Sequence, residues 1–251
     1  MKTLSLTLLV IISIGISCKK DCNCPVTSND NYAFLKDSLL LYLTFDGNLA
    51  DSSGKGNNGV GYGSFSYGQN KYFDNNQALV LNGASRIEVP GTKFDGLGKF
   101  TIYTEFMPYT GSNMVMVSKT AFNAGLNQSF NFSANYSGNG LYFNMKKAGF
   151  CDNQTLAAYS NPVGASVTPV VNAWNYGAVS FDGTTVKIYM NGQKVGEGPN
   201  PGAVFCNNAP LQIGAWWNGD PLYFNGKIDE VRVYNRVLTD SEIKAVYTYR
   251  R

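Results

Sequence analysis

The sequence predicts an all-β domain, a sandwich or jelly roll of two antiparallel sheets with one short helix near its C-terminus. Short apolar or alternating segments follow one another along the chain, and turn dipeptides that contain glycine separate them. Helical periodicity is confined to the C-terminal end. The composition agrees, because glycine is abundant at 27 residues, aromatic residues make up 14% and charged residues only 15%. Many short strands joined by tight turns are typical of sandwiches and jelly rolls.

About a dozen segments have the alternation or the short apolar run of a strand. In chain order we expect strands at 39–45, 78–81, 86–89, 100–106, 113–118, 129–134, 141–145, 174–181, 185–190, 194–196, 211–215 and 227–234. No internal repeat and no second domain boundary interrupts this series.

Turn signals predict how neighbouring strands pair. Asn82-Gly83 is typical of a two-residue hairpin turn and predicts a hairpin between 78–81 and 86–89. Similar signals predict a second hairpin and a three-stranded meander, with turns at Gly138-Asn139-Gly140, Asp182-Gly183 and Asn191-Gly192.

The C-terminal helix has a recognisable start. Thr239-Asp240-Ser241-Glu242 is a capping box, in which Thr239 caps a free amide and Glu242 reaches back. Ile243, Val246 and Tyr247 then fall on one face, which we expect to pack against the sandwich.

The first residues predict export rather than structure. Lys2 precedes a short apolar run that ends at Gly15-Ile16-Ser17-Cys18. The run is shorter than the ~20 residues that a membrane-spanning helix needs, so it is typical of a removable signal. The junction resembles the lipobox of bacterial lipoproteins, in which the cysteine is acylated and becomes the new N-terminus. It departs from that pattern at Gly15, where leucine is usual, and an ordinary signal cut nearby would leave Cys18 free.

The domain organisation follows: residues 1–17 are a signal peptide, 18–32 a flexible polar tether and 33–251 the β domain. We expect a lipid-anchored protein of the cell envelope, in the outer membrane of a Gram-negative bacterium. Lys19 and Lys20 follow Cys18 where some export signals carry acidic residues, which leaves periplasmic or surface orientation open. The formal net charge of +3, about +2 after cleavage, excludes nucleic acid as a partner.

Two of the five cysteines lie inside the domain. Cys151 and Cys206 are expected to form a disulfide in an oxidising compartment, with buried free thiols as the alternative. Cys22 and Cys24 lie in the tether and lack partners for a zinc site, since the chain has no histidine.

Three segments together resemble the laminin-G-like, concanavalin-A-like lectin jelly rolls of bacterial surface proteins. The resemblance covers about 39–247. The first motif is Leu41-Tyr42-Leu43-Thr44-Phe45-Asp46-Gly47-Asn48 with the following 51–59, and the second is Trp174-Asn175-Tyr176 with 181–192. The third motif is 224–236, which contains Ile228-Asp229-Glu230-Val231-Arg232-Val233-Tyr234. One departure is Tyr176, where the family often has histidine. The resemblance implies two antiparallel sheets in which the first and last long strands are neighbours.

The resemblance also implies a structural calcium site. Ca²⁺ takes six to eight oxygen ligands, and Asp46 and Asp229 lie on the segments that the fold would bring together, with Asn48 as a further oxygen donor. The alternative is that Asp46 and Asp51 bond turn amides while Asp229 pairs with a neighbouring Lys or Arg.

An aromatic loop is the candidate ligand site. Adjacent residues of a strand point to opposite faces, so one ring of the Trp216-Trp217 pair is a candidate platform for a sugar, whose face stacks on flat aromatic rings. Polar and aromatic neighbours that can add contacts are Asn218, Asp220 and Tyr223. The alternative is that these rings pack the loop onto the core.

Catalysis is not predicted. Without histidine, a Ser-His-Asp or Cys-His arrangement is impossible, and no strand carries the carboxylate pairs that glycosidases need. We therefore expect a protein that binds glycan without acting on it. A protein-interaction or adhesion module is the alternative, and a glycoside hydrolase or polysaccharide lyase with an unrecognised site is the third hypothesis.

Overall fold

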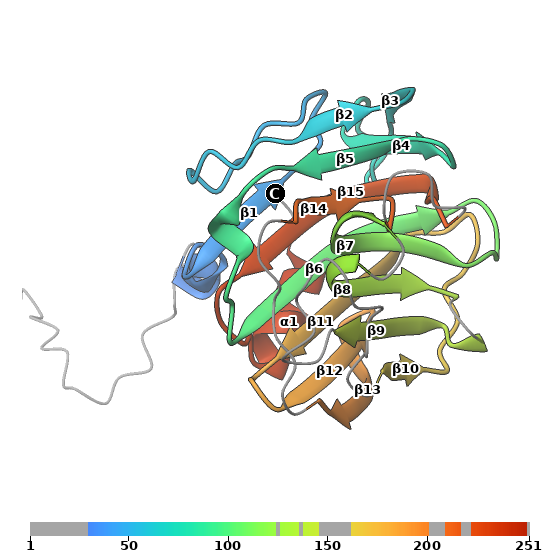
Figure 1. Ribbon diagram of the computed structural model, residues 1–251. Helices are drawn as coiled ribbons and strands as arrows, with labels where there is room; N and C mark the ends of the chain where they lie inside the picture. The colour runs from blue at the N-terminus through green and yellow to red at the C-terminus, as the bar shows by residue number, and fades with distance from the viewer. Residues whose placement is uncertain are drawn as a thin grey trace, which may run out of the picture. The chain divides into compact units, whose positions relative to one another are not determined.

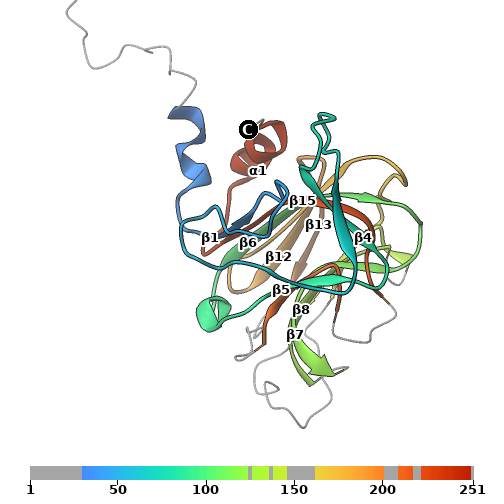
Figure 2. The same ribbon diagram turned by 90° about the horizontal axis from the view of Figure 1, so that it is seen from above.

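Two antiparallel sheets form the domain in the computed structural model, which describes residues 30–123, 126–135, 138–145, 162–200, 209–216 and 222–249. Sheet A has eight strands. Seven lie in the order β13 (Gln193–Pro199), β12 (Thr185–Met190), β11 (Asn175–Phe181), β6 (Phe100–Pro108), β15 (Asn225–Tyr234), β4 (Ala78–Asn82) and β3 (Phe65–Gly68), and the eighth, β1 (Leu39–Leu43), pairs with β15. The two layers are seen edge-on in Figure 2.

Sheet B has seven strands and forms the second layer (Figure 1). Its order is β10 (Val163–Ala165), β9 (Leu141–Met145), β8 (Leu126–Ala134), β7 (Met114–Asn123), β14 (Leu211–Ile213), β5 (Arg86–Val89) and β2 (Val60–Tyr62). The predicted sandwich of two antiparallel sheets with one C-terminal helix is thus confirmed. Among the described residues, no helix is long and apolar enough to cross a membrane.

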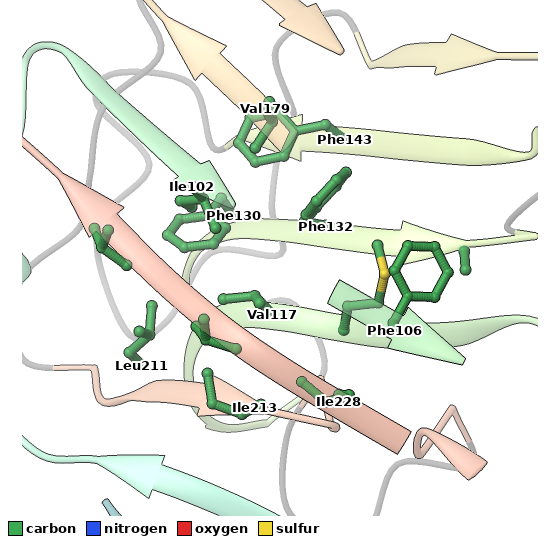
Figure 3. Close-up of a cluster of buried hydrophobic side chains, with 14 of the residues drawn as sticks. Ile102, Phe106, Val117, Phe130, Phe132, Phe143, Val179, Leu211, Ile213 and Ile228 are labelled. Carbon is green, nitrogen blue, oxygen red and sulfur yellow. The ribbon is translucent and has the colours of Figure 1, made fainter. Parts of the chain in front are cut away.

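The core lies between the sheets because alternate side chains of each strand point inward. Figure 3 shows side chains of both layers meeting there. Phe130, Phe132 and Phe143 come from sheet B and are at most 1% exposed, and Ile102 and Phe106 of sheet A are fully buried against them. Burying each such side chain contributes about 1.5–3 kcal/mol.

A second apolar cluster covers the outer face of sheet A, the face turned away from sheet B. It includes Tyr103, Tyr189 and Tyr234 of the sheet and Ile243 and Val246 of α1 (Asp240–Thr248), the helix above that face in Figure 2. The predicted capping box is confirmed: the Oγ1 of Thr239 accepts from the Glu242 amide at 3.2 Å, and Glu242 Oε2 accepts from the Thr239 amide at 2.8 Å.

The pairing of β15 positions the rest of the molecule. Along one edge β15 pairs with β6; along the other it pairs first with β4, through 225–228, and then with β1, through 231–234. Asp229 and Glu230 lie between these two pairings, where a bulge interrupts the register with β6. The neighbouring first and last strands were predicted and are confirmed.

One predicted hairpin is wrong. The strands on either side of Asn82-Gly83 do not pair: β4 belongs to sheet A and β5 to sheet B. Gly83 has the expected positive φ of 80°, but the Asn82 side chain accepts from the Ala84 amide at 3.0 Å, so the turn carries the chain from one sheet to the other. The other two turn regions join β8 to β9 and β11 to β13 as predicted.

Two short 3-10 helices complete the described chain, η1 (Asp30–Leu35) and η2 (Thr92–Phe94). η1 begins inside the predicted tether, whose last residues, 30–32, belong to this helix. The β domain forms one compact unit that begins at Phe34. Cys18, Cys151 and Cys206 lie outside the described residues, and their predicted lipidation and pairing stay predictions.

Candidate functional site

The aromatic loop predicted as a ligand site is only partly described. Trp216 is 9% exposed and follows β14, and its carbonyl oxygen accepts from the Ser118 hydroxyl at 3.0 Å. Tyr223 is half-buried. Trp217, Asn218 and Asp220 lie outside the described residues. The structure therefore buries most of one predicted platform, and the predicted role of the loop stays untested.

A row of polar side chains crosses the outer face of sheet B. Gln212 of β14 lies opposite Glu88 of β5 on one side and Ser118 of β7 on the other. The row continues from Ser118 to Asn131, which lies opposite it, and from Asn131 to Asn144. Nδ2 of Asn131 and Oδ1 of Asn144 have no hydrogen-bond partner in the described part of the chain. Amide and hydroxyl groups of this kind suit sugar hydroxyls. However, Gln212, Ser118, Asn131 and Asn144 are each at most 4% exposed. This row is therefore not an open surface for a large ligand.

A small accessible pocket lies on the outer face of sheet A. One wall is formed by the part of β15 that pairs with neither β4 nor β1. Four parts of the chain surround it: the segment between β3 and β4, strand β6, strand β15 and the end of α1. The lining residues are Asn70, Lys71, Tyr72, Glu105, Asp229, Glu230 and Tyr249.

Glu105 is the central group of this pocket. Its Oε1 accepts from the Lys71 ammonium at 2.7 Å and from the Tyr103 hydroxyl at 3.2 Å. Its Oε2 is buried and has no hydrogen-bond partner among the described residues. Burial raises the pKa of Glu105, and the positive charge of Lys71 only partly offsets this. Burial lowers the pKa of Lys71, but the Glu105 carboxylate outweighs burial and raises it overall. One carboxylate oxygen is thus anchored, and the other has no donor among the described residues.

A buried ion pair supports the wall of the pocket. Arg232 pairs with Glu230, and the hydroxyl of Tyr42 donates to both Glu230 oxygens, at 3.0 and 2.8 Å. Glu230 has a left-handed φ of 54°, a strained conformation for a residue with a side chain. The bulge turns Asp229 and Glu230 to the same outer face, as bulges near functional sites often do. Both side chains are buried, at 2% and 5% exposed.

An exposed aromatic residue follows the pocket-lining residue Tyr72 in the chain. Phe73, next to Tyr72, is 77% exposed and has a φ of 67°. Asn70 fixes this turn: its Oδ1 accepts from the amides of Tyr72 and Asp74 at 2.9 and 3.0 Å. The chain therefore holds a large apolar side chain in solvent, in a conformation that bulky residues avoid. Such outliers suggest function when they lie beside a pocket.

Two aromatic rings hold Lys71 in place. Its ammonium lies 5.0 Å from the ring centre of Tyr72 and 4.8 Å from that of Tyr176, within cation–π range. Tyr176 in turn packs edge-on against Tyr247 of α1 at 4.6 Å. Burial raises the pKa of Tyr176 to about 12, so its hydroxyl stays protonated at neutral pH. Tyr176, which stands where the resembled family often has histidine, thus supports the pocket.

The predicted calcium ligands do not form a ready site. Both ends of the Asn48 amide are used in its own turn, through the Asp46 carbonyl and the Ala50 amide, each at 2.8 Å. Oδ1 of Asp229 accepts from the Glu230 amide at 2.8 Å. Among the described residues no group of three or more Asp, Glu, Cys or His side chains is arranged to hold a metal ion. Calcium binding by Asp46, Asn48 and Asp229 therefore stays a prediction.

Sequence reasoning missed the pocket because its residues are far apart along the chain. Lys71, Glu105 and Asp229 belong to separate segments, and only the fold brings them together. One signal was present: Glu105 interrupts the otherwise uncharged strand 100–108. A charged residue in a buried strand requires a partner or a function.

Comparisons with solved structures find the same fold in binding domains. Domain 4 of AbnA, a GH43 extracellular arabinanase from Geobacillus stearothermophilus solved with arabinotriose, is 23% identical with a TM-score of 0.66, and the match covers 84% of this chain and 98% of that one. The binding domain of Paraclostridial Mosquitocidal Protein 1 is 21% identical with a TM-score of 0.66, covering 85% of this chain and 52% of that one. A botulinum neurotoxin DC binding domain in complex with rat synaptotagmin II is 14% identical with a TM-score of 0.61, covering 84% and 51%.

This chain spans nearly the whole arabinanase domain and about half of each toxin binding domain. A search of the curated proteins finds no match. A family model matches residues 81–244, well over half of the chain, from β4 to α1. The chain belongs to the concanavalin A-like lectin/glucanases superfamily, in its Laminin_G_3 family.

Proposed function

We propose that this protein is a lipid-anchored protein of the cell envelope whose domain binds carbohydrate without acting on it. The observation that carries the proposal is the pocket on sheet A, which Lys71 and Glu105 line as a hydrogen-bonded pair and whose lining segment 70–72 leads directly into the exposed Phe73. The arabinanase domain solved with arabinotriose supports carbohydrate as the ligand class on this fold.

The chemistry of the pocket suits a saccharide. One face of a sugar ring is apolar and stacks on an aromatic side chain, a role open to Phe73. Sugar hydroxyls both donate and accept, and Glu105 Oε2 is an acceptor at the floor. A site of this size binds in the micromolar to millimolar range, roughly 4–8 kcal/mol. Many copies tethered to one membrane would then raise the avidity for a polymer.

Binding without catalysis agrees with how the carboxylates are held. Glu230 is committed to Arg232 and Tyr42, and Oε1 of Glu105 to Lys71 and Tyr103. A glycosidase requires one carboxylic acid and one carboxylate placed on either side of the scissile bond, whereas the pocket here is small and Glu105 and Glu230 serve in ion pairs.

A glycan array with plant, algal and host glycans tests the proposal. The wild-type domain is expected to bind a group of related glycans, and Phe73→Gly to lose that binding. Tyr109→Ala, at another exposed ring on sheet A, is the matched control and keeps it. Absence of wild-type binding across the array would refute the proposal, and release of reducing sugar would replace it with an enzyme.

The same array tests the sequence-based candidate loop. If Trp216→Ala and Trp217→Ala remove binding while Phe73→Gly retains it, the ligand site lies at the Trp216 loop and not at the pocket. The proposed function would then stand with a different site.

Protein binding is the second candidate. A related toxin domain was solved with a protein receptor. Tyr109, Val170 and Val171 are 37%, 60% and 39% exposed here, and the Asn172 amide donates to the Pro108 carbonyl at 2.8 Å, which brings their two segments together. Exposed apolar groups are typical of protein-binding surfaces. Capture of a defined envelope protein that glycan does not displace, together with a blank array, would favour this candidate.

A further inference from the structure

The floor of the pocket on sheet A is an acceptor without a donor. The Glu105 side chain is only 3% exposed, and its Oε2 has no hydrogen-bond partner among the described residues. A buried polar atom left without a partner is costly, so a ligand group that donates to this oxygen gains the missing bond. An ionised carboxylate accepts only.

The surroundings add to this requirement. Asp229 lies opposite Glu105 in the β6–β15 register, and Glu230 follows it in the same wall. The Lys71 ammonium is already bonded to Oε1 of Glu105, and the Glu105 carboxylate offsets the positive charge of Lys71. Arg232 likewise offsets the charge of Glu230. An entering carboxylate or sulfate would therefore meet cations that are already paired, and it would place its own oxygens against Oε2 of Glu105, where neither side supplies a hydrogen.

We infer that the ligand of this pocket is a neutral saccharide, one of whose hydroxyl groups enters and donates to Oε2 of Glu105, and that uronic-acid and sulfated glycans are excluded. The inference rests on the proposed function and assigns its substrate class. Because the pocket is small, it admits one such group, while the sugar ring stays outside against Phe73.

A matched ligand pair tests the inference. Cellotriose and its form oxidised to the carboxylate at every C6 differ only in that group. Calorimetric titration of the full domain is expected to show binding of cellotriose and at least about tenfold weaker binding of the oxidised trimer, the size expected for one hydrogen bond to a charged acceptor. The neutral and acidic glycans of the array provide the same comparison for other backbones.

Variants assign the discrimination to Glu105. Glu105→Gln removes the charge but keeps the shape, and we expect it to reduce the preference for the neutral trimer to below about threefold. Glu88→Gln, the same change on the outer face of sheet B, should leave the preference intact. Thermal unfolding checks that both variants are folded.

The outcomes separate the substrate class from the function. If the acidic glycans bind as well as the neutral ones or better, in the trimer pair or on the array, the inference is wrong and the proposed function stands. If no glycan of either class binds, the proposed function is wrong. If Glu105→Gln fails to fold, the difference between neutral and acidic trimer binding by the wild-type domain decides the inference alone.

Discussion

Glu105 and Asp229 lie directly opposite each other in the β6–β15 pair, at the point where β15 passes from its pairing with β4 to its pairing with β1. β4 and β1 pair with successive parts of the same edge of β15, and between their ends the side chains on the outer face have room. The bulge at Asp229 and Glu230 directs both to that face. The pocket is thus a consequence of the sheet topology.

Replacing Phe73 by glycine should separate binding from stability. The left-handed φ of 67° costs a side chain about 1–2 kcal/mol, which glycine avoids. The greater flexibility of glycine in the unfolded chain costs about 0.5–1 kcal/mol. We therefore expect the free energy of unfolding, from urea titration, to change by less than about 1 kcal/mol while glycan binding is lost. A large destabilisation would show that Phe73 has a structural role.

Arg232→Met should be strongly destabilising. It leaves the buried Glu230 carboxylate without its cation, which typically costs about 3–5 kcal/mol. The double variant Glu230→Met with Arg232→Met removes both charges and should recover most of that loss. Urea unfolding of the three proteins measures it, and equal stability of the single and double variants would contradict the prediction.

Asp51 should make stability depend on acid. Burial disfavours its ionised form, but bonds from the amides of Ser53, Tyr42 and Asn57 outweigh burial and lower its pKa below the usual value. Because the pKa of Asp51 is lower in the folded protein than in the unfolded chain, its ionised form stabilises the protein at a pH above the pKa of the unfolded chain. This stabilisation is lost as the pH falls through the pKa of the folded protein.

The test variant is Asp51→Asn. It should unfold about 1–3 kcal/mol more easily at neutral pH, because the new amide faces the Asn57 amide. Its stability should fall less than that of the wild type between about pH 5 and about pH 2. Asp74→Asn, at an exposed position, is the control, and parallel pH curves for wild type and Asp51→Asn would show that Asp51 does not carry the acid dependence.

Glycan binding should weaken on mild acidification. Burial raises the pKa of Glu105, so this carboxyl takes up its proton at a higher pH than an ordinary glutamate. Once protonated it no longer presents two acceptor oxygens. Affinity for a neutral glycan should fall as the pH drops from neutral into the range where Glu105 is protonated. In Glu105→Gln the same titration should be flat; an equally steep curve in that variant would point to another group.

Cys18→Ala should release the protein from membranes. The lipobox-like junction predicts acylation at Cys18, and a diacylated anchor is the kind of double attachment that holds a protein stably at a bilayer. In a bacterial host, wild-type protein should partition into the detergent phase and Cys18→Ala into the aqueous phase. Wild-type protein in the aqueous phase would show that Cys18 is not lipidated.

The sequence predicts best what is local. Strands with apolar alternation, such as those in 100–106 and 185–190, and the capped helix after Thr239 are all present because their signals lie within a few residues. β2, β3 and β10 were missed, since three or four residues that contain glycine have little pattern of their own and form only by pairing with a neighbour.

The site is the opposite case. Its contacts join Lys71 to Glu105 and Tyr42 to Glu230, pairs far apart in sequence that only the strand order brings together. Asn82-Gly83 shows the same limit, because its local signal specifies a tight turn but not whether the next strand stays in the sheet. Pairing partners are decided by how the layers bury their apolar faces, which no short segment encodes.

Chemical-shift mapping during titration with the strongest array hit tests the central claim most directly. If the pocket on sheet A is the glycan site, the amides that shift most are those of 70–73, Glu105, Asp229, Glu230 and Tyr249. Shifts confined to the region around Trp216 and Tyr223, or no shifts at saturating glycan, would contradict it.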